Sequence, residues 1–188
     1  AYKNNNNLVL IESAYLSQNY EAEFEELWNG QFGKGGRVPF PVIGWNNITI
    51  KNYFCPEDDC RGKVRAEIQK ANSSIYFMAF SFTDDFIGRD LVIKKAEGID
   101  VRGVFEKTKL SNYSEYNLLK YQGIDVRTDT NKYNLHHKVF IIDNRTVVTG
   151  SFNPSSNANF ENDENLLVIE DNKVAGLFLM EFSSLAWT

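Results

Sequence analysis

Residues 136–153, HHKVFIIDNRTVVTGSFN, constrain the fold of this 188-residue chain more than any other stretch. They combine a β-branched apolar run with polar and glycine positions at fixed spacing: H-x-K, four residues, D, six residues, G-S-x-N. Each part is common alone, since a single histidine on an apolar strand is usually packed and Gly-Ser-x-Asn is a frequent turn. Their joint occurrence at this spacing favours a functional site. The six positions are His136, Lys138, Asp143, Gly150, Ser151 and Asn153.

The apolar run at residues 135–142 predicts a β-strand. Alternate side chains of a strand share a face, so we expect His136 and Lys138 on one side and His137 on the other. Asp143 ends the run on the face opposite His136, which favours a structural role for its carboxylate. The strand therefore presents a neutral imidazole and an ammonium together.

This pair, followed by a Gly-Ser-Phe-Asn turn, suits an anionic ligand. Lys138 would supply charge, and Ser151 and Asn153 would supply short hydrogen-bond donors. The pattern resembles the signature of the phospholipase D superfamily, which the chain matches at every fixed position. The resemblance implies a phosphodiesterase lobe in which Lys138, Ser151 and Asn153 bind phosphate, while Asp143 and Gly150 shape the motif.

Composition restricts the class of protein further. With 43% hydrophobic and 14% aromatic residues, the chain has the composition of a globular protein and is long enough for one α/β domain with an appendage. We find no apolar run of membrane-spanning length and no signal peptide, and we expect a cytoplasmic protein. The net charge of −5 argues against purely charge-driven nucleic-acid binding, although residues 102–145 hold eight Lys/Arg against five acids.

The first residues carry an internal repeat. Residues 4–27 align without a gap on residues 162–185, and each copy predicts a strand followed by an amphipathic helix. The strands are expected at Leu8–Glu12 and Leu166–Glu170, and the helices at Ala14–Trp28 and Asn172–Ala186. Eight aligned pairs are identical: Asn4/Asn162, Asn7/Asn165, Leu8/Leu166, Ile11/Ile169, Glu12/Glu170, Glu23/Glu181, Phe24/Phe182 and Leu27/Leu185.

Three segments follow from the repeat. Residues 1–30 are expected to be the strand–helix tail of a preceding, mostly absent lobe, and residues 47–188 a complete phospholipase D-like lobe. Residues 31–46, rich in Gly and Pro, are expected to be a linker. Since the chain begins Ala-Tyr-Lys without an initiator Met, we expect a fragment or a processed product.

Within the lobe, strand and helix patterns alternate. The expected strands are residues 47–54, 74–82, 99–106, 124–127, 135–142, 146–148 and 166–170, and the expected helices are 61–71, 84–97, 114–121 and 172–186. Such alternation predicts an α/β fold with a mixed, mostly parallel β-sheet flanked by helices on both faces.

The two cysteines, Cys55 and Cys60, leave three alternatives: a local disulfide, two reduced thiols or a metal site. A zinc site would need both motif histidines as further ligands, and we do not expect one. A disulfide would imply an oxidising compartment or a thermophilic source.

The family resemblance implies a role for Glu164 at the entrance of the last expected strand. In the superfamily, an acid at this position hydrogen-bonds the motif histidine, fixing its tautomer and stabilising the imidazolium. The aligned residue in the first copy is Asn6, which would stabilise an imidazolium less. We therefore expect His136, Lys138 and Glu164 to be catalytic.

The resemblance further implies a two-step reaction without metal ion or cofactor. One histidine would attack phosphorus to give a phosphohistidine, and a second motif histidine would protonate the leaving oxygen. This chain contains one copy of the motif, so a preceding lobe or a second chain in a homodimer must complete the site, as in the small dimeric endonucleases of the superfamily.

Three functions remain open at this stage. Cleavage of DNA or RNA is the first, because the surroundings of the motif are mildly basic, and exposed tyrosines could stack bases. Hydrolysis or transfer of a phospholipid headgroup, as in a phospholipase D or a cardiolipin synthase-like phosphatidyltransferase, is the second. The third is a non-catalytic phosphate-binding or dimerisation lobe, in which His136→Ala would leave ligand binding nearly intact.

Overall fold

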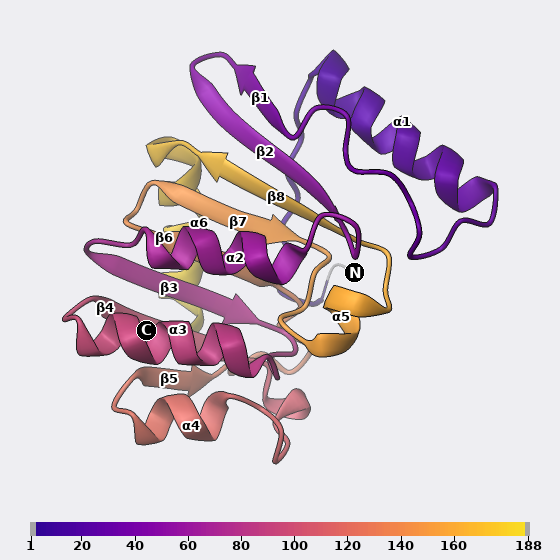
Figure 1. Ribbon diagram of the computed structural model, residues 1–188. Coiled ribbons are helices and arrows are strands. Elements are labelled where there is room, and N and C mark those ends of the chain that lie inside the picture. Colours follow the sequence, from indigo (N-terminus) through magenta and orange to yellow (C-terminus); the bar gives the residue numbers. More distant parts are fainter. Residues whose placement is uncertain (1–2, 187–188) are drawn as a thin grey trace.

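A computed structural model describes residues 3–186 (Figure 1). Its centre is one eight-stranded sheet with the strand order β1-β2-β8-β7-β6-β3-β4-β5. The strands are β1 (Val42–Trp45), β2 (Ile48–Cys55), β3 (Ser74–Ala79), β4 (Asp100–Phe105), β5 (Asp125–Thr128), β6 (Lys138–Ile142), β7 (Thr146–Gly150) and β8 (Glu164–Glu170). The helices are α1 (Ala14–Trp28), α2 (Cys60–Gln69), α3 (Asp85–Ala96), α4 (Tyr116–Tyr121), α5 (Ser156–Phe160) and α6 (Asn172–Ala186), with one 3-10 turn, η1 (Lys107–Lys109).

The predicted mixed sheet flanked by helices is confirmed, but its pairing is more antiparallel than expected. Strands β3, β4 and β5 run parallel, whereas the other five pairings among the described residues are antiparallel. Tight hairpins are one reason. Asn46 and Asn47 join β1 to β2, and Asp143 and Asn144 join β6 to β7, all four with positive φ. Two such residues in succession suit the twist of an antiparallel hairpin.

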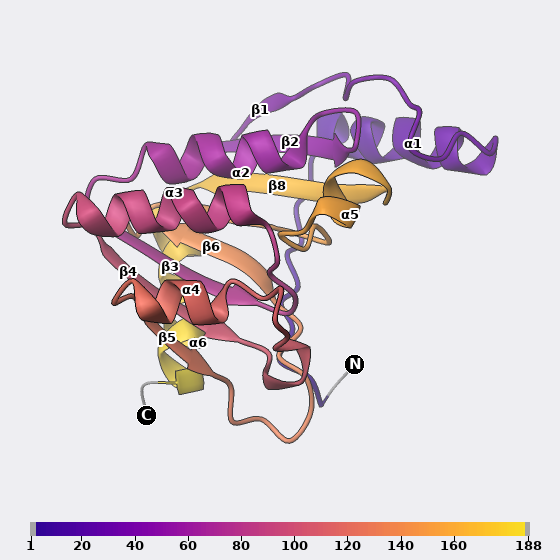
Figure 2. The same cartoon turned by 60° about the horizontal axis from the view of Figure 1, so that its bottom comes forward.

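Helices cover both faces of the sheet. On one face, α2 and α3 pack Ile68, Ile87 and Leu91, all fully buried, against a core that contains Phe77 of β3. Each such side chain contributes about 1.5–3 kcal/mol by leaving water. Figures 1 and 2 show α2, α3 and α4 in front of the sheet and α6 behind it, where Phe178 and its neighbours pack on β6 and β7.

The two repeat helices are confirmed at the expected residues, but the first repeat strand is not. Residues 8–12 have no strand partner, and Leu8 and Leu10 are 94% and 93% exposed. The preceding residues touch the sheet through one parallel bridge between Asn5 and Leu135. An extended segment joins a sheet only beside a strand that has an unpaired side. Beside β6 no side is free, because β3 and β7 already pair with it. Helix α1 packs instead through Leu16 on β2 and β8.

The expected linker at residues 31–46 also contains a strand. Its last residues form β1, which pairs with β2 in the register Trp45↔Ile48. The Gly and Pro content of the segment concealed this short edge strand. Residues 31–41 have no helix or strand.

One edge of the sheet collects the polar ends of most strands. Strands β2, β3, β4, β5 and β7 end there, while β6 and β8 begin there, as the arrowheads in Figure 1 show. Both ends of the sequence motif, Lys138 at the start of β6 and Gly150 at the end of β7, therefore lie at this edge. We refer to it as the site edge.

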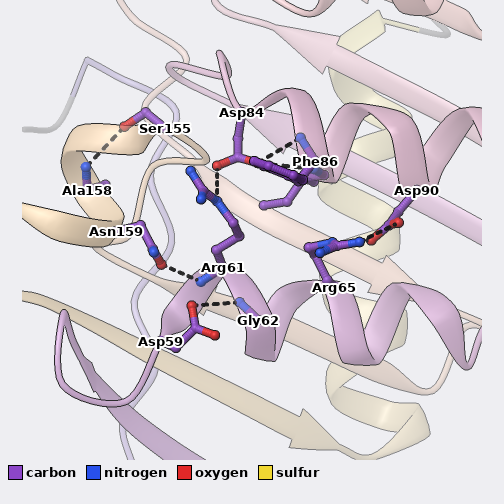
Figure 3. A network of polar contacts seen from close by, with 11 residues as sticks. Asp59, Arg61, Gly62, Arg65, Asp84, Phe86, Asp90, Ser155, Ala158 and Asn159 are labelled. Atoms are coloured by element: carbon purple, nitrogen blue, oxygen red, sulfur yellow. Dashed lines mark hydrogen bonds and ion pairs between the residues drawn. The ribbon is translucent and has the colours of Figure 1, made fainter.

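Polar contacts fasten the segment after the motif to the helical layer (Figure 3). The Arg61 guanidinium bonds Asp84 at the start of α3 at 2.5 Å, and its backbone N–H donates to Asn159 of α5 at 2.8 Å. The same guanidinium lies over the rings of Phe86 and Phe160, each at 5.0 Å. Arg61 thus ties α2, α3 and α5 together.

The cysteines form a disulfide. Cys55 at the end of β2 and Cys60 at the start of α2 are both fully buried, with their Cα atoms 5.7 Å apart. Because Cys55 also pairs with Glu164, the disulfide braces the site edge directly beside the start of β8.

Candidate active site

The predicted alternation around the motif histidine is present. His136 and Lys138 line the same pocket at the site edge, whereas His137 points to the opposite side. There the His137 ring contacts Asn7 Oδ1 at 2.9 Å and Glu181 Oε1 at 3.2 Å. Because His137 is only 1% exposed, His136 is the motif imidazole that a ligand in the pocket can reach.

The pocket has a volume of about 340 Å³ and is mostly polar in its lining residues. This size suits a phosphodiester group with part of its substituents. The first repeat segment forms one wall, because the Asn5 carbonyl accepts a hydrogen bond from the His136 N–H at 2.9 Å. The lining residues are Asn6, Asn7, His136, Lys138, Gly150, Ser151 and Asn165.

Ser151 is held in place by Asn165. Its Oγ accepts hydrogen bonds from the Asn165 backbone N–H at 3.0 Å and from Asn165 Nδ2 at 3.3 Å, so the hydroxyl hydrogen can be donated to a ligand. Gly150 makes this approach possible. It has φ +150°, and an added Cβ would lie 2.2 Å from the Asn165 carbonyl oxygen.

Partial removal from water lowers the pKa of both motif side chains, His136 and Lys138. Burial, together with the charges of Lys138 and His137, lowers the pKa of His136 below its usual value, so the imidazole is neutral and nucleophilic near pH 7. Burial lowers the pKa of Lys138 to about 8, against the opposing effect of the Glu164 carboxylate. The Lys138 ammonium also donates to the His136 carbonyl at 3.0 Å.

Phe80, directly after β3, lies beside these two residues. Its ring packs edge-on against the His136 imidazole with centroids 4.6 Å apart. The Lys138 ammonium lies 4.8 Å from the centre of the same ring, and the Lys109 ammonium lies 4.9 Å from it. Phe80 is therefore a shared support for an imidazole and two cations.

Glu164 does not make the expected contact. Within residues 3–186, its carboxylate accepts a hydrogen bond from Asn162 Nδ2 at 3.1 Å and forms none with His136. It is 9% exposed and lines a neighbouring cavity of about 330 Å³, which α1 covers with Tyr20 and Phe24. Its effect on the motif pocket is electrostatic, through Lys138.

Two further predicted residues lie outside the pocket. Asn153 does not line it, and its buried Oδ1 has no hydrogen-bond partner in the described chain. Asp143 lies at the opposite edge of the sheet, where its carboxylate accepts N–H bonds from Asn72, Ser73 and Ser74 at 2.8–3.2 Å. That position fits the structural role expected for Asp143.

Sequence reasoning did not select Asn165, Asn6, Asn7 or Phe80 as site residues. One signal pointed to two of them, because Asn7 and Asn165 are an identical pair in the repeat alignment, and both line the pocket. No sequence pattern marked Phe80, which reaches His136 only because β3 and β6 are neighbours.

Two structural facts bear on ligands and membranes. Residues 3–186 contain no group of three or more His, Cys, Asp or Glu side chains arranged to hold a metal ion. Among the same residues, we find no helix with the length and apolar character needed to cross a membrane.

Comparison with known proteins identifies the family. The family described as "Cardiolipin synthase, PLD-like domain" matches residues 64–187, about two thirds of the chain. A phospholipase D from Rickettsia prowazekii is 35% identical over 178 residues, covering 94% of this chain and 84% of that protein. The chain therefore belongs to the phospholipase D superfamily.

Other relatives carry other names and match shorter parts of this chain. A human mitochondrial cardiolipin hydrolase is 36% identical over 113 residues, covering 60% of this chain and 45% of that protein. The crystal structure of Nuc, a phospholipase D family member from Salmonella typhimurium, aligns with a TM-score of 0.70 at 35% identity. That match covers 74% of this chain and 94% of Nuc. The superfamily phosphodiesterase activity is supported by these relatives.

Proposed function

We propose that this protein cleaves phosphodiester bonds of nucleic acids through a covalent intermediate on His136. The observation that carries the proposal is that His136, Lys138 and Ser151 line one pocket of phosphodiester size. Within it, a neutral imidazole stands beside an ammonium and a hydroxyl donor that is fixed by Asn165. These are a nucleophile and two groups able to stabilise negative charge.

The reaction proceeds in two displacements. A nitrogen of His136 attacks phosphorus, a P–N bond forms and the P–O bond to the leaving group breaks. A second motif histidine donates its proton to the departing oxygen. That histidine then takes a proton from water, whose oxygen attacks phosphorus and releases His136. Lys138 and Ser151 stabilise the extra charge on the phosphoryl oxygens in both steps, and Glu164 helps to keep Lys138 protonated.

The second histidine comes from another copy of the chain. The chain contains only two histidines, and His137, directly before β6, is buried on the α6 side of the sheet. The Rickettsia prowazekii relative aligns with 94% of this chain over 84% of its own length, which leaves no room there for a second lobe of similar size. This favours a homodimer with a site shared across a two-fold axis over a preceding lobe.

The charge around the pocket favours a polyanionic substrate. Four lysines, which we call the lysine flank, lie on the β4–β5 side of the site edge: Lys3, Lys107, Lys109 and Lys132, all exposed. The acids of this region are turned inward. Glu106 and Asp129 are 0% and 3% exposed, and their carboxylates accept backbone N–H bonds. The outward field is therefore positive, as a phosphate backbone requires.

A nuclease assay tests this proposal. Single- and double-stranded DNA and RNA are incubated with wild type and with His136→Asn, with and without EDTA, and oligomeric state is measured by light scattering. We expect EDTA-insensitive cleavage by a dimer and none by the variant. Cleavage of a simple diester, bis(p-nitrophenyl) phosphate, without cleavage of any nucleic acid would contradict the proposed substrate.

A mixing experiment tests the shared site. Differently tagged wild type and His136→Asn are coexpressed, and the mixed dimer is isolated by two affinity steps. Because a shared site needs both imidazoles, the mixed dimer should be as inactive as the variant homodimer. Half of the wild-type activity in the mixed dimer would show that each chain works alone.

A phospholipid is the second candidate substrate, and one surface feature favours it. Leu8 and Leu177 line a groove beside the motif pocket, and Leu8, Leu10, Leu177 and Met180 are between 63% and 94% exposed. Such a patch can rest on a lipid surface. Two relatives named phospholipase D and cardiolipin hydrolase support the same candidate. Sedimentation with cardiolipin-containing vesicles, followed by lipid analysis, tests it against the nuclease assay.

A further inference from the structure

The Phe80 ring joins the motif pocket to the lysine flank. The ammonium groups of Lys138 and Lys109 lie 4.8 and 4.9 Å from its centre, so the two charges are less than about 10 Å apart. An aromatic face holds such cations favourably while leaving their N–H groups free to bind a ligand. Lys109 belongs to η1, the turn that directly follows β4 at the site edge.

Lys109 is not engaged in an ion pair. In the part of the chain from residue 3 to 186, no carboxylate lies within bonding distance of its ammonium, and its side chain is exposed. Its neighbour Lys107, by contrast, donates to the Asn131 carbonyl. The Lys109 charge is thus available to an anion beside the motif pocket.

The other side of the pocket carries the opposite charge. There the cavity under α1 is lined by Glu23, Asp163 and Glu164 together with aromatic side chains. Burial and the nearby charges of Glu57, Glu26, Asp163 and Asp58 raise the pKa of Glu23 to about 7, which reflects how crowded with negative charge this side is. A second phosphate would be repelled there and attracted on the Lys109 side.

We propose that Lys109 binds the phosphate next to the scissile one, so that the site prefers a strand with at least two consecutive phosphates. This inference rests on the proposed nuclease function. Phe80 sets the distance between the two cations, and consecutive phosphates of one strand fall within it. Lys138 holds the phosphate under attack, and Lys109 holds the phosphate next to it.

Substrates that differ by one phosphate test the proposal. The dinucleotide TpT has one phosphodiester and the trinucleotide TpTpT has two, and bis(p-nitrophenyl) phosphate reports the chemistry alone. Steady-state kinetics are measured for wild type and for Lys109→Ala, with circular dichroism to verify folding. Lys173→Ala is the matched control, because it removes the same charge from an exposed residue at the opposite edge of the sheet.

We expect Lys109→Ala to raise KM for TpTpT about five- to tenfold, with no change for TpT or bis(p-nitrophenyl) phosphate. On a longer oligonucleotide, the slope of log KM against log salt should fall by roughly 1, as for the loss of one phosphate contact. Lys109→Arg should restore the preference, and Lys173→Ala should change none of these values.

Two results would overturn the inference. Equal KM changes for TpT and TpTpT would mean that Lys109 acts on the scissile phosphate or on the fold. Wild type that cleaves both with the same KM would mean that no second phosphate is bound. Failure of the nuclease proposal is distinct, since wild type would then cleave bis(p-nitrophenyl) phosphate and neither nucleotide.

Discussion

The Ser151 hydroxyl accepts two hydrogen bonds from Asn165, at 3.0 Å from its backbone N–H and at 3.3 Å from its Nδ2. This leaves the Ser151 hydrogen as the donor toward the pocket. Ser151→Ala removes that donor, and we expect kcat to fall roughly 10- to 100-fold with little change in thermal stability. Asn165→Ala removes the Nδ2 donor, so the Ser151 hydroxyl can rotate more freely, and kcat should fall about tenfold. If both variants keep full kcat, Ser151 does not contact the reacting phosphoryl group.

The pH dependence of kcat/KM should be bell-shaped. The nucleophile is lost as pH falls below the lowered pKa of His136, because the protonated imidazole has no free electron pair. Phosphate binding is lost as pH rises through about 8, because burial lowers the pKa of Lys138 to that value. Activity should then drop up to tenfold per pH unit. In Lys138→Arg, whose guanidinium stays charged, the part of the alkaline decline that is due to the ammonium should disappear, and only the decline from deprotonation of the proton-donating histidine should remain. A decline above pH 8 as steep as that of wild type would assign the loss to another group.

Asp143 should matter for stability and not for chemistry. Its carboxylate accepts N–H bonds from Asn72, Ser73 and Ser74 where the chain enters β3, and these bonds outweigh the effect of burial and lower its pKa. Asp143→Ala should reduce the free energy of unfolding by about 2–3 kcal/mol. Urea denaturation measures this loss, and kcat/KM of the folded fraction should stay at the wild-type value. A stable variant with low kcat/KM would instead give Asp143 a part in the site.

Glu115 should make stability depend on pH. Burial, followed by the nearby Asp85 and Asp84, raises the pKa of Glu115 to about 7. The folded chain therefore binds this proton more tightly than the unfolded chain. The free energy of unfolding should rise as pH falls from about 7 toward 4.5, the pKa of Glu115 in the unfolded chain, and it should stay constant below that pH. Glu115→Gln removes this dependence and should be more stable than wild type at pH 8, by on the order of 1 kcal/mol. Parallel pH profiles of unfolding for the two proteins would contradict this.

Much of the fold followed from periodicity in the sequence. The alternation at residues 135–142 correctly separated His136 and Lys138 from His137, because side-chain direction in a strand depends only on local geometry. The two repeat helices likewise have the expected bounds, since each carries its own apolar stripe and an unbroken run without proline.

What the sequence could not supply depends on neighbours in space. Leu8–Glu12 has the composition of a strand but no free edge to pair with, and β1 was concealed by the Gly and Pro residues around it. Asn165 enters the pocket because Gly150 lets β7 and β8 approach closely. The contact between Glu164 and His136 was predicted from family resemblance. It is missing because the Glu164 carboxylate bonds Asn162 and lines the cavity under α1, which the sequence did not reveal.

The preceding-lobe origin of residues 1–30 stays a prediction, as do phosphate binding by Asn153 and the catalytic role of Glu164. The disulfide between Cys55 and Cys60 is typical of an oxidising compartment, whereas the sequence favoured the cytoplasm. Mass spectrometry of protein purified without reductant distinguishes the disulfide from two reduced thiols, because the oxidised chain is about 2 Da lighter.

Direct trapping of the intermediate tests the central claim. Wild type is mixed with an oligonucleotide, quenched in alkali within its first turnover, and digested for mass spectrometry. We predict an alkali-stable, acid-labile nucleotidyl adduct on His136, absent in His136→Asn and present in His137→Gln. Cleavage that persists in His136→Asn, or an adduct that maps to another residue, would contradict His136 as the nucleophile.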